Sequence, residues 1–226
     1  FEQMIAGDLT GLPPLPRSIV RIFLSSTFSD THAERNILSS KVFPRLREYC
    51  NDIGLDFQVV DLRWGVADQA QNYHTATKIC LQEIENCQRV SLGPNFIAFV
   101  SHRYGGQPLP TELTLQQFEV MNSEITKLDF QDGELFSKWF QLDENNLPPN
   151  YVLQHVTTFL PHFGDLSYGN EAEAKKDAEI WKETLQKLKT MTQLAADSLF
   201  KKKKFSAAEK HTFFKSGNEL VVMRVI

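Results

Sequence analysis

Residues 19–35 read IVRIFLSSTFSDTHAER: a short apolar run, a hydroxyl-rich turn, and the start of an amphipathic segment. A nearly continuous apolar run of this length is typical of a buried central strand. Residues 55–65, LDFQVVDLRWG, supply a second strand after the intervening helix. Strand, turn, helix and strand in this order open a parallel α/β sheet, whose ligands bind at the carboxyl ends of its strands. The candidate ligand-binding residues at these ends are Ser25, Ser26, Thr27, Arg63 and Trp64.

The first helix is expected to follow the turn directly. Asp30 or Thr31 can cap it, and Thr31 with Glu34 three residues later forms a capping-box pattern. Apolar residues then recur near one helical face as far as Ile53. Pro44 interrupts this pattern, so we expect a kink or a restart there.

A third strand-loop-helix unit is predicted after the helix that carries Ile84. Residues 95–101 form the strand, and the glycine- and proline-rich loop after it carries His102, Arg103 and Tyr104, which join the candidate ligand-binding residues. The spacing of apolar residues predicts a helix over 115–128. Three such units predict a doubly wound, three-layer α/β fold with helices on both faces of a mostly parallel sheet.

Beyond residue 129 the pattern loosens. Residues 151–160 are predicted as an edge strand or an extended arm, and residues 171–200 as a helix by propensity and period. The run of lysines at 201–204 is interpreted as a solvated helix end. We therefore expect an N-terminal arm at 1–18, an α/β domain at 19–165 and a C-terminal helical extension at 166–226.

Composition excludes several classes of function. With 226 residues and 42% hydrophobic content the chain can form one substantial core, and a formal net charge of -4 gives no general attraction to nucleic acid or anionic lipid. Three cysteines without metal-ligand spacing suit reduced thiols, and the scattered histidines predict no metal site. No apolar stretch reaches the length of a membrane span, so we expect a cytoplasmic protein. Because the chain begins at Phe1, we expect it to be part of a longer protein.

Five motifs in order carry a resemblance to a known family. The chain resembles the amino-terminal region of the NACHT and WD-repeat proteins, and is also similar to the telomerase-associated vault protein. The motifs are RIFLSSTFSDTHAER at 21–35, VVDLRWGV at 59–66, CLQEIENCQ at 80–88, SHRYGG at 101–106 and DENNLPPNYVLQ at 143–154.

The resemblance implies a fold and a context. The region is similar to Toll/interleukin-receptor (TIR) domains, which share a flavodoxin-like sheet and serve in signalling assemblies. In the family it precedes a NACHT module, toward which residues 166–226 would lead. These 226 residues contain neither a GxxxxGK[ST] phosphate loop nor WD repeats, so ATP binding is assigned to a NACHT module outside them.

Some TIR-like domains cleave NAD, and the resemblance places Glu119 at the position of their catalytic carboxylate. Such a group stabilises the positive charge that develops on the ribose as nicotinamide leaves. Glu112, seven residues earlier on the same side of the helix, is a rival for this role. Under this hypothesis NAD is a substrate, and the chain itself carries no cofactor.

Two hypotheses follow from the sequence. The favoured one is a non-enzymatic module that binds protein partners or copies of itself. The alternative is an NAD-cleaving hydrolase that uses Glu119, and it requires an open cleft that brings together Ser26, Arg63 and Glu119. Fold analogy alone does not choose between them.

Overall fold

The apolar run at the start of the chain forms strand β1 (Ile19–Ser25), the centre of a three-stranded parallel sheet. β2 (Asp56–Val60) and β3 (Phe96–Ala98) flank it in the order β2-β1-β3. Ile22, Phe23 and Leu24 of β1 are buried, as expected of a strand with neighbours on both sides. All three predicted parallel strands are thus confirmed.

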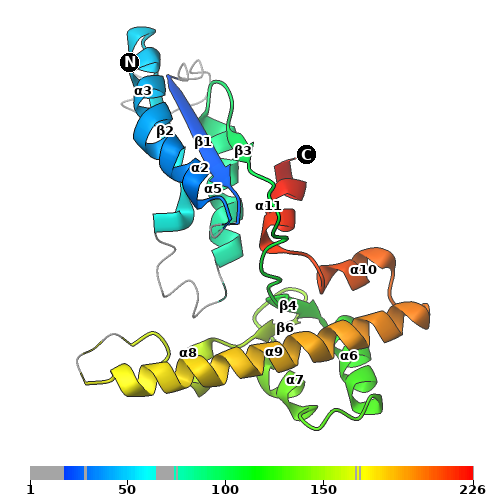
Figure 1. The fold of residues 1–226 in the computed structure, drawn as a ribbon. Coiled ribbons are helices and arrows are strands. Elements are labelled where there is room, and N and C mark those ends of the chain that lie inside the picture. The colour runs from blue at the N-terminus through cyan, green and yellow to red at the C-terminus, as the bar shows by residue number, and fades with distance from the viewer. Residues whose placement is uncertain are drawn as a thin grey trace, which may run out of the picture.

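The computed structural model describes residues 18–27, 30–64, 74, 76–165, 167 and 169–225. Within these residues the chain forms two lobes, each with its own sheet and hydrophobic core (Figure 1). The parallel sheet and its helices make the first lobe. An antiparallel sheet and the long helix α9 (Glu171–Lys201) belong to the second lobe.

One face of the parallel sheet is covered by a helix in three sections. α2 (His32–Ile37) leads into a π-helical turn, η1 (Leu38–Val42), and then into α3 (Phe43–Asp52). Pro44 lies in the first turn of α3, and the wider π turn before it accommodates a residue that has no N–H to donate. The restart predicted at Pro44 is confirmed.

The predicted capping box at the start of α2 is absent. Thr31 is the N-cap residue, but its side chain makes no capping hydrogen bond. Its hydroxyl instead donates to the carbonyl oxygen of Thr27, at 2.6 Å. The Thr31 hydroxyl therefore stabilises the turn before α2 instead of capping the helix as the sequence pattern predicts.

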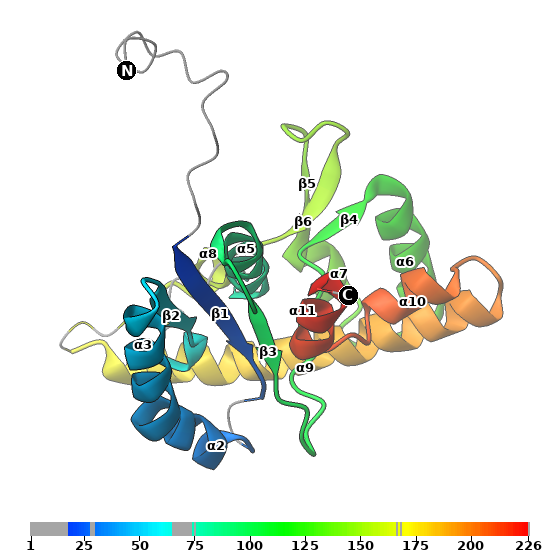
Figure 2. The ribbon, with the colours of Figure 1, turned by 90° about the horizontal axis from the view of Figure 1, so that it is seen from above.

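The opposite face of the sheet is covered by two helices from distant parts of the chain. α5 (Ala76–Val90) precedes β3, whereas α11 (Gly217–Val225) returns to the sheet from the second lobe (Figure 2). Ile84 and Cys87 of α5 form one buried cluster with Val221 of α11 and Phe23 of β1. The first lobe is thus completed by residues from the far end of the sequence.

The second lobe is built on an antiparallel sheet. Its strands β4 (Glu112–Thr114), β5 (Phe140–Asp143) and β6 (Asn150–Leu153) lie in the order β4-β6-β5. β6 is therefore the central strand, and a short helix, α8 (Val156–Phe159), follows it. The prediction of an edge strand or arm over 151–160 was wrong, because β4 and β5 pair with both sides of β6.

The third predicted strand-loop-helix unit is divided between the lobes, because its strand β3 lies in the first lobe and its helix lies in the second. α6 (Leu115–Lys127) begins directly after β4, with a capping box between Thr114 and Gln117, and packs on α9. It does not continue the parallel sheet, because residues 99–111 carry the chain from β3 to the second lobe. The coarse fold, a mixed α/β protein with a three-stranded parallel sheet, is confirmed.

Helix α9 is part of the core of the second lobe. The core joins Leu188 and Met191 of α9 to Met121 of α6 and to Phe136 of α7 (Glu134–Trp139). The Trp139 and Trp181 rings lie 4.7 Å apart between their centroids. Residues on both sides of position 165, where the predicted α/β domain ends, thus share one core.

α9 is followed by α10 (Ala207–Thr212), which leads back toward α11.

The lysine run at the end of α9 makes specific ion pairs. Lys202 Nζ lies 2.5 Å from Glu124 Oε1, and Ser198 donates to the same oxygen at 2.6 Å. Glu124 is 2% exposed, so the pair joins the interior of α6 to the end of α9. The hydrogen bonds from Lys202 and Ser198 lower the pKa of Glu124.

Replacing Leu188 by Ala tests whether α9 belongs to this core. Leu188 is fully buried, so Leu188→Ala should lower the free energy of unfolding by about 2–5 kcal/mol. Leu194→Ala on the same helix is the matched control, because Leu194 is 51% exposed and its loss should cost less than about 1 kcal/mol. Urea denaturation measures both. Equal, small losses would show that α9 does not pack as described.

Candidate functional site

A fully buried arginine organises the carboxyl end of the parallel sheet. Arg35 of α2 donates from Nε to the hydroxyl of Ser26 at 2.8 Å, and from Nη2 to the carbonyl of Leu24 at 3.2 Å. Its Nη1 donates to Asp61, which follows β2. Burial lowers the pKa of Arg35, and the charge of Asp61 opposes this effect. The side chain thus ties together the ends of β1 and β2 and the first helix.

The hydroxyl-rich turn after β1 is held by its own hydrogen bonds. The hydroxyl oxygens of Ser26 and Thr31 lie 2.6 Å apart, and Ser25 and Ser26 are both buried. Thr27 donates to the carboxylate of Asp30. In this structure the turn hydroxyls serve the local fold, as short polar side chains often do between a strand and a helix.

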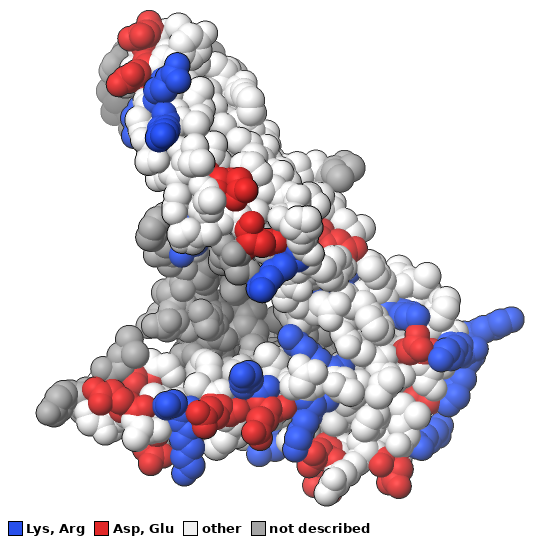
Figure 3. Space-filling model, in the orientation of Figure 1, with Lys and Arg blue, Asp and Glu red and all other residues white. Residues whose placement is uncertain are grey.

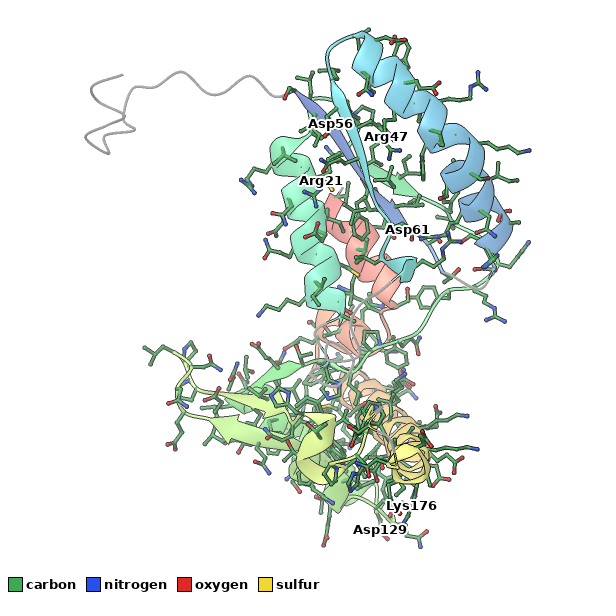
Figure 4. All side chains as sticks on the ribbon, turned by 90° about the vertical axis from the view of Figure 1, so that its left-hand side faces the viewer. Arg21, Arg47, Asp56, Asp61, Asp129 and Lys176 are labelled. Atoms are coloured by element: carbon green, nitrogen blue, oxygen red, sulfur yellow. The ribbon has the colours of Figure 1, made fainter. Side chains whose placement is uncertain are left out.

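Arg63 lies on the outer side of this network. It belongs to the short 3-10 helix η2 (Leu62–Trp64), and its backbone N–H donates to Asp61 Oδ1 at 3.0 Å. Its Nη1 donates to Asn36 Oδ1 of α2 at 2.8 Å. Figure 4 shows Asp61 just beyond β2, at the opposite end from Asp56. Arg63 therefore connects the end of β2 to α2.

A concavity with mostly apolar walls opens beside β1, and its volume is about 780 Å³. Its walls are the end of β1, the buried Arg35, the start of α5, the glycine-containing loop after β3, and α11. The residues of the loop and α11 that line it are Arg103, Tyr104, Gly105, Gly106, Gly217 and Val221. A cavity at this edge, between β1 and β3, occupies the usual ligand position of an open α/β sheet.

A second cavity of about 410 Å³ lies on the other side of the same loop. It shares Ser25, Ser26, Arg103 and Tyr104 with the first cavity. Its remaining walls are residues 98–102 and the outer side of α11, with Val222 and Met223. The loop after β3 and helix α11 therefore shape both cavities.

Polar contacts hold this loop against α11. The hydroxyl of Tyr104 donates to the carboxylate of Glu219, and His211 Nε2 lies 2.6 Å from Glu219 Oε1. The backbone N–H of Gly217 donates to the carbonyl of Gly106 at 3.0 Å. The hydrogen bond from Tyr104 is the main cause that lowers the pKa of Glu219; burial opposes it, and a smaller contribution from the hydrogen bond of His211 lowers the pKa further. An ionised Glu219 thus fastens α11 to the loop.

The structure brings together only part of the predicted site. Ser25, Ser26, Thr27, Arg103 and Tyr104 line the larger cavity, and His102 lines the smaller one. Arg63 faces α2 and lines neither cavity among the residues described. The side chain of Trp64 lies outside the described residues.

The two candidate catalytic carboxylates lie in the second lobe. Glu119 is exposed on α6, and Glu112 is exposed on β4, where it accepts a hydrogen bond from Asn150 at 3.1 Å. Neither lines the two cavities of the first lobe. The separation arises because residues 99–111 carry the chain from β3 to a different sheet.

Three residues of the site were not found from the sequence. Arg35 and Asp61 form its buried ion pair, and Glu219 anchors α11. Arg35 stands four residues after the buried Thr31, so both lie on the inner face of the first helix turn. This spacing was the available signal for Arg35, whereas nothing local in the sequence indicated that α11 returns to the first lobe.

Neither a metal cluster nor a membrane span is found in the described part of the chain. Across residues 18–225, gaps aside, no three His, Cys, Asp or Glu side chains gather as metal ligands would. The described helices all lack the combination of length and apolarity needed to cross a bilayer. On the face shown in Figure 3, most of the charged side chains lie on the second lobe.

Removing the buried guanidinium should destabilise the first lobe. Arg35→Met leaves Asp61 and Ser26 without their partner in the interior, so we expect a loss of about 3–5 kcal/mol in the free energy of unfolding. Arg47→Met on α3 is the control, because Arg47 is exposed (Figure 4) and its loss should cost less than about 0.5 kcal/mol. Chemical denaturation measures both, and a neutral Arg35→Met would contradict the described network.

Weakening the contact of Glu219 should loosen α11. Cys87 is fully buried in the cluster that contains Val221, so we expect a loosened α11 to make it more accessible to a thiol reagent. Glu219→Gln removes the charge that accepts from Tyr104 and His211, and should speed the labelling of Cys87 severalfold. Cys50, buried on the opposite face of the sheet, is the internal control and should keep its rate. Equal acceleration at both thiols would indicate general unfolding instead.

The predicted resemblance to the NACHT and WD-repeat proteins is confirmed by comparison with known sequences. The chain is 33% identical over 218 residues to "NACHT and WD repeat domain-containing protein 2" of Homo sapiens, covering 92% of this chain and 12% of that protein. It is 38% identical over 121 residues to "NACHT domain- and WD repeat-containing protein 1" of Mus musculus, which is 54% of this chain and 8% of that protein. The similarity to "Telomerase protein component 1" of Mus musculus is 32% over 108 residues, 48% of this chain and 4% of that protein.

The chain thus spans only a small part of these relatives. No solved structure gives a significant match. A family model described as "Domain of unknown function (DUF4062)" matches residues 21–210, which include both lobes. The chain therefore belongs to the DUF4062 family, and it is similar to a region of the NACHT and WD-repeat proteins.

Proposed function

We propose that this chain is the N-terminal protein-interaction module of a NACHT and WD-repeat protein, and that it contributes binding surface rather than catalysis. The observation that carries the proposal is the separation of Glu119 from the hydroxyls and Arg103 at the cavities. The described lining of the larger cavity holds no carboxylate. Its buried guanidinium and the hydroxyls of Ser26 and Thr27 are engaged in the local fold.

The fold supports a TIR-like assignment within this proposal. The strand order β2-β1-β3, with α3 and α5 on opposite faces, is the order in which a flavodoxin-like sheet begins (Figure 2). TIR-like domains serve in signalling assemblies, which would give the chain the role of a cytoplasmic scaffold. Free thiols at Cys50, Cys80 and Cys87 suit a reducing compartment.

The names of the relatives support an assembly role. They combine NACHT and WD repeats, and WD repeats form propellers, which present broad surfaces to partners. In such a protein, ATP would bind to the NACHT part and the propeller would contact other proteins. The chain described here would add a further contact surface, whose weak contacts gain strength when several copies are joined.

Two assays on the same purified chain test this function. The chain is immobilised and exposed first to itself and then to the NACHT-containing remainder of "NACHT and WD repeat domain-containing protein 2". In parallel, wild type and Glu119→Ala are incubated with NAD, and nicotinamide release is followed by chromatography. We expect saturable binding to one of the two proteins and no release of nicotinamide. If the wild type releases nicotinamide, Glu119→Ala does not, and neither protein binds the chain, the interaction module is rejected in favour of an NAD-cleaving hydrolase.

A further inference from the structure

Strand β3 is an open edge of the parallel sheet. It pairs with β1 through Phe23↔Phe96, Leu24↔Ile97 and Ser25↔Ala98, and the N–H of Phe99 donates to the carbonyl of Ser25 at 2.9 Å. Along a parallel strand, the N–H and C=O groups of one residue point to the strand on one side, and those of the next residue point to the other side. Phe96, Ala98 and Val100 therefore turn their N–H and C=O groups away from β1. Among the described residues, none bonds to these outward groups.

β3 is short, with only three residues, but this edge lacks the side chains that usually protect an open strand. Natural edges are guarded by charged side chains, by proline or by a bulge. Residues 95–101 read NFIAFVS, without a charged residue or a proline. Ala98 is exposed, and the side chain of Val100 is 90% exposed. The edge is thus an unguarded template for another strand.

An apolar surface from α11 lies beside the edge. Val221 faces the core of the first lobe, whereas Val222 and Met223 line the cavity of about 410 Å³ together with Val100. Met223 is 57% exposed. A short helix with apolar residues on both sides is typically covered on both sides. The outer side of α11 and Val100 thus place apolar side chains next to unpaired backbone groups, in a cavity whose walls also include His102, Arg103 and Glu219.

We propose that a second copy of this chain pairs with this edge in antiparallel orientation, about a two-fold axis at Ala98. The proposal rests on the proposed function and names its partner. In this arrangement Ala98 of the two copies lie opposite one another, and Phe96 of each lies opposite Val100 of the other. An edge strand is complementary to itself under a two-fold axis, because each outward N–H of one copy then faces an outward C=O of the other copy.

Charge and size define how strong this contact is. The paired segments are uncharged, so no like charges meet at the contact, and the net charge of -4 on each chain acts only over a distance. Three outward residues and a small apolar patch bury far less than the roughly 1,200–2,000 Å² of a stable interface. The isolated chain therefore dimerises weakly, and added salt strengthens the dimer by screening the net repulsion.

Sedimentation equilibrium from micromolar to millimolar concentration tests the proposal with a matched pair of variants. Val100→Lys places a charge on the edge, and Leu147→Lys places one on the β5–β6 turn of the second lobe, where Leu147 is 94% exposed. Both positions are exposed, so both variants should fold as the wild type does, which circular dichroism checks. We expect wild type and Leu147→Lys to dimerise with similar Kd, and Val100→Lys to weaken Kd by roughly tenfold or more. A monomer at every concentration, or equal Kd for both variants, would overturn the proposal.

A cysteine at the proposed axis tests the register. Under mild oxidation Ala98→Cys should give a covalent dimer joined at position 98, because directly opposed strand residues lie within disulfide reach. Leu147→Cys, at a position that is also exposed, should stay monomeric. Dimers joined at other positions would contradict the register. A wild-type chain that binds the NACHT-containing remainder but does not self-associate would reject this dimer while leaving the proposed interaction function in place.

Discussion

The first lobe depends on the burial of one positive charge. A guanidinium in a protein interior is stable only when its hydrogen bonds are made, and Arg35 makes them to Ser26, to Asp61 and to the carbonyl of Leu24. These partners lie at the ends of β1 and β2. The hydrogen bonds of Arg35 therefore fix the positions of both strand ends and the position of α2 relative to the sheet. The apolar cluster of Ile22, Phe43 and Phe57 then packs on an already defined frame.

The cavities exist because the chain crosses twice between the lobes. Residues 99–111 lead from β3 to the second lobe, and α11 brings the chain back onto α5. Tyr104 of the first crossing binds Glu219 of the second, so each crossing holds the other in place. A ligand or partner that displaced α11 would therefore change the loop as well.

Local pattern predicted much of the fold, and long-range packing decided the rest. β1, α5 and α9 were predicted because apolar spacing alone identifies them. The central place of β6 and the separation of α6 from the parallel sheet depend on pairings between distant segments, which periodicity does not contain. At the site, Ser25 and Arg103 came together as expected because parallel strands end at one edge. Arg35 was missed because an arginine in a helix is normally counted as exposed.

The return of α11 also affects the order in which the molecule folds. Phe23, Ile84 and Cys87 leave the ribosome long before Val221, which covers them. During synthesis this face of the sheet stays open while the whole second lobe is made and folded. The first lobe to be translated is thus the last to be finished, and its interior is exposed to chaperones and to aggregation for the time that more than a hundred intervening residues require.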